Sequence, residues 1–302
     1  MNATVERFLQ YLRLERNLSW RTVERYRRDL QQWSAFAAGD GELDLPSVTA
    51  SDIRSWLMNR AKHGDSPATL RLHLQALRAL YRYLLRQGVV AANPAAMVEL
   101  AKLPKPLPKY VRESTVDAVL DADIDAEDFA QVRDRLIVML FYETGIRLSE
   151  LIDLQDAAVD TAKGELKVHG KRDKDRIVPF GNELAAAVEH YRTLRAQLAP
   201  ECDNLLVTAR GKALYPSLVY HVVHDALATA GGTGKLSPHV LRHTFASVML
   251  NSGAELNSVK ELLGHESLAA TQVYTHVTLS ELQHNYELAH PRALKKGGYY
   301  GS

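Results

Sequence analysis

Hydrophobic residues recur at helical spacing through the first third of the chain. Ser19 is placed as the N-cap of one such helix, and Ser66 followed by Pro67 opens another, which Gly88 ends. The apolar stripes of these two helices are Tyr26, Leu30 and Trp33 in the first, and Leu70, Leu74, Leu77, Tyr81 and Leu84 in the second. This spacing predicts four or five helices over residues 1 to about 95.

The helical pattern stops at a segment rich in proline and lysine. Between Asn93 and Lys109 the chain holds four prolines and three lysines, a composition that forbids a continuous helix and favours an extended path. We therefore expect a helical domain over residues 1–93, a linker over 94–110 and a second domain with a C-terminal tail over 111–302.

The second domain combines helix-like and strand-like patterns. Its stretch from Val132 to Tyr142 is nearly all apolar on one side, which predicts a central helix. Residues 165–169 and 176–179 alternate or cluster as strands around a charged turn, and residues 205–208 suggest a third strand. The predicted fold class is mainly α with a small β-sheet, in which a helical N-terminal domain precedes a mixed α+β domain.

Composition narrows the class of protein. A chain of 302 residues with 46% hydrophobic residues is long enough for two modest cores, which agrees with two domains. Its single cysteine, Cys202, excludes an intrachain disulfide, and its first residues carry no apolar signal core. No apolar run approaches the roughly 20 residues that cross a bilayer. We expect a cytoplasmic protein with no membrane partner.

Charge is divided unevenly between the two parts of the chain. Residues 1–103 hold 15 Lys and Arg against 10 Asp and Glu, whereas residues 104–302 hold 22 against 26, so the net charge of +1 hides a basic first part. The candidate phosphate contacts on its helices are Arg21, Arg25, Arg28, Arg71, Arg78 and Arg82. Basic helical surfaces are typical of proteins that follow a nucleic-acid backbone, and a solvated polar face is the alternative interpretation.

Residues in the second domain have the chemistry to attack a phosphodiester. Segment 237–244 supplies His239 and Arg242, and segment 144–151 supplies Arg147. In the transition state of phosphodiester cleavage, negative charge spreads over the non-bridging oxygens, which the planar fork of a guanidinium suits. Two arginines can therefore stabilise this charge, and we expect neither a metal ion nor a cofactor.

Three further residues complete the set. Tyr274, nine positions after His265, is a nucleophile that can leave again, so a phosphotyrosyl ester would be reversible. Lys171, in the predicted turn, is the candidate general acid for the departing sugar oxygen. His239 and His265 can bond phosphate oxygens or carry the tyrosine proton.

Each of these residues has a simpler explanation when taken alone; Arg147, for example, can form a helix-surface ion pair with Glu150. As a set they resemble the tyrosine recombinase (phage-type integrase) family, whose pattern is an arginine, a hairpin lysine, His-x-x-Arg, a second His or Trp, and a tyrosine. The matching positions are Arg147, Lys171, His239, Arg242, His265 and Tyr274. The resemblance covers nearly the whole chain, and its helical N-terminal domain is similar to the family's core-binding, SAM-like domain.

Two local features refine the resemblance. The compact length and the tetrapeptide of residues 290–293 are most similar to the Xer recombinases, which resolve chromosome dimers in bacteria. The hairpin departs from the commoner Gly-Lys-Gly pattern, because Lys171-Arg172-Asp173-Lys174 stands there. Lys174 is thus a second candidate for the general acid.

The resemblance implies a reaction and an assembly. The two domains would clamp a double-stranded DNA recombination site, and Tyr274 would hold the cut strand as a 3′-phosphotyrosyl ester while a 5′-hydroxyl departs. Four protomers on two sites, identical or paired with a paralogous recombinase, would pass through a Holliday junction, with a DNA translocase as an activating partner. Neighbours would exchange a C-terminal element, for which Leu282, Tyr286 and Ala289 have helical spacing.

Other functions remain open at this point. An integrase or resolvase of a mobile element would use the same chemistry on other sites. A DNA-binding regulator would keep the fold without catalysis. A phosphoryl-transfer enzyme acting on small substrates would use a histidine such as His239 as nucleophile, and would leave the basic N-terminal helices without a role.

Overall fold

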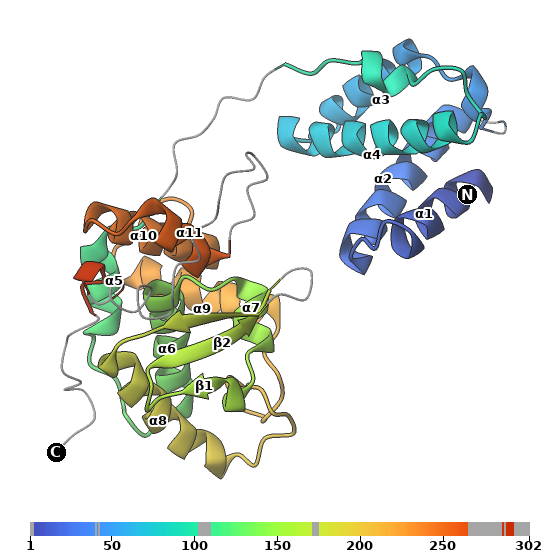
Figure 1. Ribbon diagram of the computed structural model, residues 1–302. Helices are drawn as coiled ribbons and strands as arrows, with labels where there is room; N and C mark the ends of the chain where they lie inside the picture. The colour runs from blue at the N-terminus through green and yellow to red at the C-terminus, as the bar shows by residue number, and fades with distance from the viewer. Residues whose placement is uncertain are drawn as a thin grey trace. The chain divides into compact units, whose positions relative to one another are not determined.

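The chain folds as two compact units. A computed structural model describes residues 3–39, 41, 43–101, 110–170, 175–264, 286 and 288–292. The two units span Met1–Lys105 and Pro106–Ser302, so the division falls within the predicted linker 94–110 (Figure 1). No helix in these described ranges is long and apolar enough to cross a membrane.

The first unit is a helical bundle. Its helices are α1 (Ala3–Leu14), α2 (Trp20–Ala38), α3 (Ala50–Lys62) and α4 (Pro67–Arg86), with the short 3-10 helices η1 (Leu45–Ser47) and η2 (Pro94–Met97). The predicted caps are confirmed, because the Ser19 and Ser66 side chains accept hydrogen bonds from the backbone N–H groups of Thr22 and Thr69. The two predicted stripes face the core, where all their residues are buried except the half-buried Leu70.

A buried polar group lies inside this bundle. The His73 imidazole lies 3.1 Å from Asp29 on one side and 3.1 Å from Asp65 on the other. The hydrogen bond to Asp29 raises the pKa of His73 above its ordinary value, and the bond to Asp65 adds to this against the opposing effect of burial. Asp29 and Asp65 also pair with Arg25 and Arg60, so α2, α3 and α4 are joined by one charged network.

The second unit is built around one buried helix, α6 (Phe129–Thr144), which confirms the central helix predicted from Val132 to Tyr142. The other elements are α5 (Glu113–Leu120), α7 (Leu148–Asp153), η3 (Asp156–Ala158), β1 (Val159–Asp160), β2 (Glu165–His169), β3 (Asp175–Pro179), α8 (Asn182–Gln197), α9 (Pro216–Thr229), α10 (Pro238–Asn251) and α11 (Leu256–Leu263). Figure 1 shows the sheet in front of α6, with α10 and α11 together at the end of the unit away from α8.

The sheet is small and antiparallel. Strands β2 and β3 pair from Glu165 with Pro179 to His169 with Asp175, which confirms the two predicted strands. Strand β1 adds two residues to the outer edge of β2. Residues 170–174 connect the two strands, and of these the structure describes Gly170.

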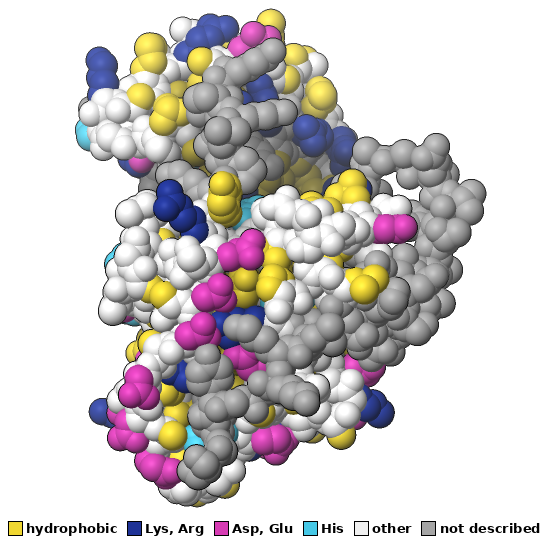
Figure 2. All heavy atoms as spheres, turned by 90° about the vertical axis from the view of Figure 1, so that its left-hand side faces the viewer, with side chains coloured by type: hydrophobic (Ala, Val, Ile, Leu, Met, Phe, Trp, Pro, Cys, Tyr) yellow, Lys and Arg dark blue, Asp and Glu magenta, His cyan; other side chains and the backbone are white. Residues whose placement is uncertain are grey.

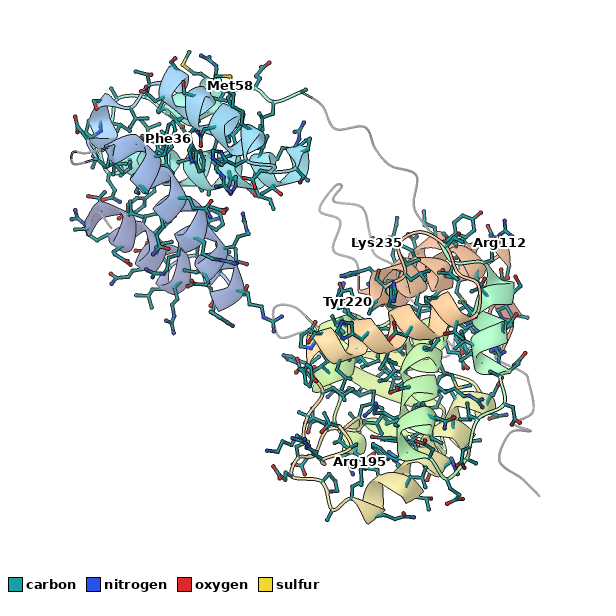
Figure 3. All side chains as sticks on the ribbon, turned by 180° about the vertical axis from the view of Figure 1, so that it is seen from behind. Phe36, Met58, Arg112, Arg195, Tyr220 and Lys235 are labelled. Carbon is teal, nitrogen blue, oxygen red and sulfur yellow. The ribbon has the colours of Figure 1, made fainter. Side chains whose placement is uncertain are left out.

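The third strand predicted over residues 205–208 is wrong. Val207 forms only an isolated bridge with Ala213, and its N–H donates to the Tyr191 hydroxyl. The N–H of Leu205 donates to the Leu154 carbonyl, so this run does not form a continuous ladder with another strand. Just before this run, the carbonyl oxygens of Cys202 and Asn204 accept hydrogen bonds from Arg195, which extends from α8 (Figure 3). The apolar run is buried because it covers the core, not because it is a strand.

A short C-terminal segment packs on the core of the second unit. Tyr286 and Ala289, two of the residues proposed for an exchanged element, are buried there, and Leu282 lies outside the described residues. The buried Arg292 donates to Glu183 at 2.5 Å and to Asp121 at 2.7 Å. In this single chain the segment thus occupies its own unit.

Candidate active site

The C-terminal end of α11 gathers three arginines. The carbonyl oxygens of residues 262, 263 and 264 each accept a hydrogen bond from a different guanidinium: Leu262 from Arg176 at 2.7 Å, Leu263 from Arg242 at 2.5 Å and Gly264 from Arg147 at 2.6 Å. Helix C-terminal carbonyls lack intrahelical partners and carry partial negative charge, so they suit arginine donors. Segments far apart in the sequence therefore meet at one point.

One carboxylate holds two of these arginines. Glu150, buried on α7, accepts four hydrogen bonds: from the backbone N–H and Nη1 of Arg147, and from Nη1 and Nη2 of Arg176, at 2.6–2.8 Å. Burial alone would raise the pKa of Glu150, but the hydrogen bonds from Arg176 and from the Arg147 backbone outweigh it and lower this pKa to about 2. Glu150 is therefore an anion at neutral pH, and its pair with Arg147 is an internal one, not the surface pair considered from sequence.

Two glycines in left-handed conformations shape the same place. Gly145 ends α6 with φ +58°, and its carbonyl accepts a 2.5 Å bond from Arg242. Gly264 ends α11 with φ +61°, and a Cβ there would lie 3.2 Å from Nη1 of Arg176 and 3.4 Å from Nη1 of Arg147. Glycine is required at both because other residues rarely adopt this conformation and a side chain would crowd the arginines or the core.

Arg242 is the more buried of the two predicted phosphate ligands. Burial, together with repulsion from Arg147, lowers the pKa of Arg242 to about 10. It is still protonated at neutral pH. Both arginines use only part of their N–H donors on protein carbonyls and Glu150, and the guanidinium has further donors for an anion. This part of the second unit is thus a preorganised cationic site.

His239 lies three residues before Arg242 on α10, which places both on one face of the helix. Its side chain is exposed at the first turn. Burial on one side, and repulsion from Lys235 and Arg242, lower the pKa of His239 below its ordinary value. Lys235 extends from the loop that leads into α10 (Figure 3). A neutral imidazole at this position can accept or donate a proton.

The structure brings together three of the six predicted catalytic residues, Arg147, His239 and Arg242. The other three, Lys171, His265 and Tyr274, lie outside the described residues, as does Lys174. Their attachment points are described: Lys171 follows Gly170 at the end of β2, and His265 directly follows Gly264.

Sequence reasoning missed Arg176 and the role of Glu150. The spacing of three residues between Arg147 and Glu150 indicated an ion pair, but it did not reveal that the Glu150 side chain is buried. Arg176 had a weaker signal, a charged residue directly before the apolar run Ile177-Val178-Pro179 of the predicted strand. Neither signal shows that the two side chains meet, because they are 26 residues apart.

The six candidate DNA contacts in the first unit fall into two groups. Arg78 donates to the carbonyls of Ala95 at 3.1 Å and Val98 at 2.6 Å, and Arg71 donates to that of Ala101. These two side chains hold the segment after α4 against the helix. Arg25 pairs with Asp29 and lies over the Tyr26 ring.

The remaining arginines, Arg21, Arg28 and Arg82, are exposed. Arg82 shares a groove with Arg71, Arg78 and Glu99 on the first unit. Figure 2 shows Lys and Arg side chains over the first unit, while Asp and Glu side chains gather on the second. On the face seen in Figure 2, the charge therefore follows the division expected from the sequence.

The sequence of this chain matches two known family patterns. Residues 109–281 match the Phage integrase family, and residues 5–88 match the Phage integrase N-terminal SAM-like domain. The chain belongs to the phage integrase family. The predicted fold class, a SAM-like helical domain followed by an integrase catalytic domain, is thereby confirmed.

Relatives of this integrase extend over its whole length. It is 38% identical over 301 residues to tyrosine recombinase XerC of Pseudomonas aeruginosa (strain LESB58), covering 100% of this chain and 99% of the relative. It is 39% identical over 292 residues to tyrosine recombinase XerD of Pseudomonas aeruginosa (strain PAO1), covering 95% and 97%. The protein is a tyrosine-type site-specific DNA recombinase, as predicted.

Solved structures of the same fold include DNA complexes. The XerH recombinase bound to difH substrate superposes with a TM-score of 0.67 at 22% identity, covering 88% of this chain and 80% of that one. A λ integrase dimer bound to a COC′ core site gives a TM-score of 0.68 at 17% identity, covering 90% and 98%. At these identities the likeness shows the fold.

Proposed function

We propose that this recombinase cuts DNA by attack of Tyr274 on a scissile phosphate. A bond forms between the phenolic oxygen and phosphorus, the bond from phosphorus to the 5′-oxygen breaks, and the strand is held as a 3′-phosphotyrosyl ester. The observation that carries the proposal is the preorganised pair Arg147 and Arg242, anchored on neighbouring carbonyls at the end of α11. Fixed guanidinium groups match the charge of the transition state and need no reorganisation when it forms.

Protons move at both ends of this step. The phenolic proton of Tyr274 leaves for a histidine, and His239 is suited to accept it because its lowered pKa keeps it neutral at pH 7. The departing 5′-oxygen takes a proton from Lys171 on the β2–β3 hairpin. In the reverse direction, a 5′-hydroxyl of a second duplex attacks the phosphotyrosyl ester and releases Tyr274. The strand is rejoined in a new pairing without loss of bond energy.

The proposed substrate is a pair of double-stranded recombination sites, one on each of two duplexes. Four protomers would act on this pair, and the exchange would pass through a Holliday junction. The XerC and XerD proteins of Pseudomonas aeruginosa resemble the chain almost equally, at 38% and 39% identity. This supports a paralogous recombinase as partner. We further propose that the protein resolves chromosome dimers at cell division, with a DNA translocase as activator.

The test is covalent trapping. The full chain is incubated with nicked duplexes that carry candidate chromosomal-dimer sites, denatured, and scored for labelled DNA that stays attached to protein. We expect an adduct with the native chain and none with Tyr274→Phe. An adduct that forms only on mobile-element sites would reject the chromosomal role and keep the chemistry. Salt-sensitive binding without an adduct on any site, even from wider site libraries, would instead indicate a DNA-binding regulator.

A further inference from the structure

Arg176 lies on β3, outside the set of residues that carry the proposed chemistry. Its Nη1 and Nη2 donate to the two carboxylate oxygens of Glu150 at 2.8 and 2.7 Å, and its Nε donates to the Leu262 carbonyl at 2.7 Å. The side chain is only 13% exposed. Because each of its three nitrogens has a protein acceptor, Arg176 is oriented toward the protein scaffold.

Both partners of Arg176 also hold the phosphate-binding arginines. Glu150 accepts from the backbone N–H and the Nη1 of Arg147. Leu262 begins the run of carbonyls whose next two members accept from Arg242 and Arg147. Arg176 therefore fixes, from one point on β3, the carboxylate and the helix end that together aim the two guanidinium groups.

The electrostatics show what its loss would do. Without Arg176, both oxygens of the buried Glu150 would lose a charge-assisted donor, and the Leu262 carbonyl at the end of α11 would lose its partner. Arg147 is the only other cation bonded to Glu150 among the residues that the structure describes. The carboxylate would draw the Arg147 guanidinium toward itself and away from an incoming phosphate.

We propose that Arg176 is a positioning residue for strand cleavage, which sets the geometry of Arg147 through Glu150 and through the C-terminal end of α11. The inference rests on the proposed function, because it assigns a role within that reaction. Arg176 itself does not touch the scissile phosphate. In contrast, Arg147 and Arg242 each have protein acceptors for two of their three side-chain nitrogens among the described residues.

The experiment compares four variants of the full chain: Arg176→Gln, Glu150→Gln, the double variant, and Arg192→Gln as a matched control. Arg192 also donates several bonds, to Asp156, Glu189 and the Val159 carbonyl, but these partners lie outside the arginine cluster. Single-turnover cleavage is measured on a nicked duplex with an ordinary scissile phosphate and on one with a methylphosphonate there. The methylphosphonate removes one negative oxygen and with it part of the need for guanidinium charge.

On ordinary DNA, Arg176→Gln is expected to slow cleavage on the order of 100-fold, the usual effect of a misplacement of about 1 Å, with DNA affinity unchanged. On the methylphosphonate, the ratio of native to variant rates should shrink. The double variant should be slower than Glu150→Gln by much less than the factor that Arg176→Gln costs in the native chain, because the two changes share the route through Glu150 and only the bond to the Leu262 carbonyl is lost in addition. Arg192→Gln should cleave both substrates at the native rate.

Three results would overturn the proposal. An equal defect on both substrates would show that Arg176 only stabilises the fold. Weaker DNA binding with a smaller salt dependence would show a direct phosphate contact. A native rate in Arg176→Gln would show no role. If the native chain formed no Tyr274-dependent adduct, the proposed function itself would fail and this inference with it, an outcome that the native control separates from the other three.

Discussion

At the scale of single residues, the site depends on backbone groups as much as on side chains. The carbonyl of Gly264 accepts a hydrogen bond from Arg147 and orients it. Gly264 adopts a left-handed conformation, and a Cβ on it would lie 3.2 Å from the Arg176 guanidinium. The preorganisation of the cationic site therefore depends on a turn that carries no side chain of its own.

Gly264→Ala tests this dependence. The added methyl group would press on Nη1 of Arg176 at 3.2 Å and touch Nη1 of Arg147 at 3.4 Å. A shift of the Arg176 guanidinium should slow cleavage at least tenfold, or about 1.4 kcal/mol of transition-state stabilisation. Gly253→Ala is the control, because Gly253 also has a positive φ, +92°, but open space around its Cβ position. Both variants should lose similar thermal stability, roughly 1 kcal/mol from backbone strain. Equal cleavage rates in single-turnover assays would contradict the argument.

A second residue-scale prediction concerns pH. The pKa of His73 is raised above 6.5 by its bonds to Asp29 and Asp65. The protonated imidazole therefore stabilises the first unit fully below that value, and this stabilisation is lost as the pH rises through the raised pKa. Urea unfolding followed by tryptophan fluorescence reports on this unit alone, since Trp20, Trp33 and Trp56 all lie in it.

The unfolding free energy of the first unit should decrease as the pH rises from the ordinary histidine value of 6.5 through the raised pKa of His73. In His73→Gln this pH dependence should be reduced, and the unit should be less stable by roughly 1 to 3 kcal/mol near pH 6, because the buried Asp29 and the half-buried Asp65 lose the charged donor that they share. His63→Gln, a change at an exposed histidine of the same unit, should leave the curve unaltered. A flat native profile would show that His73 does not titrate in this window.

The sequence indicated candidate site residues, but it did not indicate the hydrogen bonds and ion pairs that hold them in place. Arg147, His239 and Arg242 could be chosen as candidates because the residues around them form a recurrent motif, and their catalytic roles stay predictions. Glu150 and Arg176 were not, because their role arises from contacts between α7, β3 and α11 that only folding creates. Likewise, the motif gave no reason to expect that the α6 and α11 termini would supply the acceptors for Arg242.

At the scale of elements, local signals succeeded where one element determines its own boundaries. Ser19, Ser66 and Pro67 marked helix starts because capping is a local interaction. The run at 205–208 misled because a buried apolar segment of that length fits a strand or a covering loop, and only its tertiary partners, Leu154 and Tyr191, decide between them.

The C-terminal segment yields an element-scale prediction. Arg292→Gln removes the cation that pairs with Glu183, whose side chain is 3% exposed, and it also releases Asp117 and Asp121. An uncompensated buried charge should destabilise the second unit by about 3 kcal/mol in urea unfolding followed by circular dichroism. Lys163→Gln, which breaks an exposed pair with Asp160, should change it by less than about 1 kcal/mol. Similar small losses in both variants would mean that the segment adds little to folding in its own unit.

At the scale of the whole molecule, the two units differ in charge, and this difference bears on how they would share a DNA substrate. The first unit displays Lys and Arg side chains, and the second is acidic on the face seen in Figure 2 while holding its cations in the arginine cluster. Sequence-independent affinity would then come mainly from the first unit, and the charges of the second would act at one phosphate.

A matched pair of arginines on α4 separates DNA contact from support of the fold. Arg82 is exposed and has no hydrogen-bond or ion-pair partner among the described residues, whereas Arg78 holds the carbonyls of Ala95 and Val98. Arg82→Gln should weaken binding similarly on all DNA sequences and reduce the salt slope by about 1, with stability unchanged. Arg78→Gln should instead destabilise the first unit by roughly 1 to 3 kcal/mol, because two carbonyls lose a charged donor.

Salt titrations of DNA binding measure the phosphate contact in both variants, and tryptophan-detected unfolding measures the stability of the first unit. If the two effects were exchanged, Arg78 would be the phosphate contact, and the segment after α4 would have to release it when DNA binds.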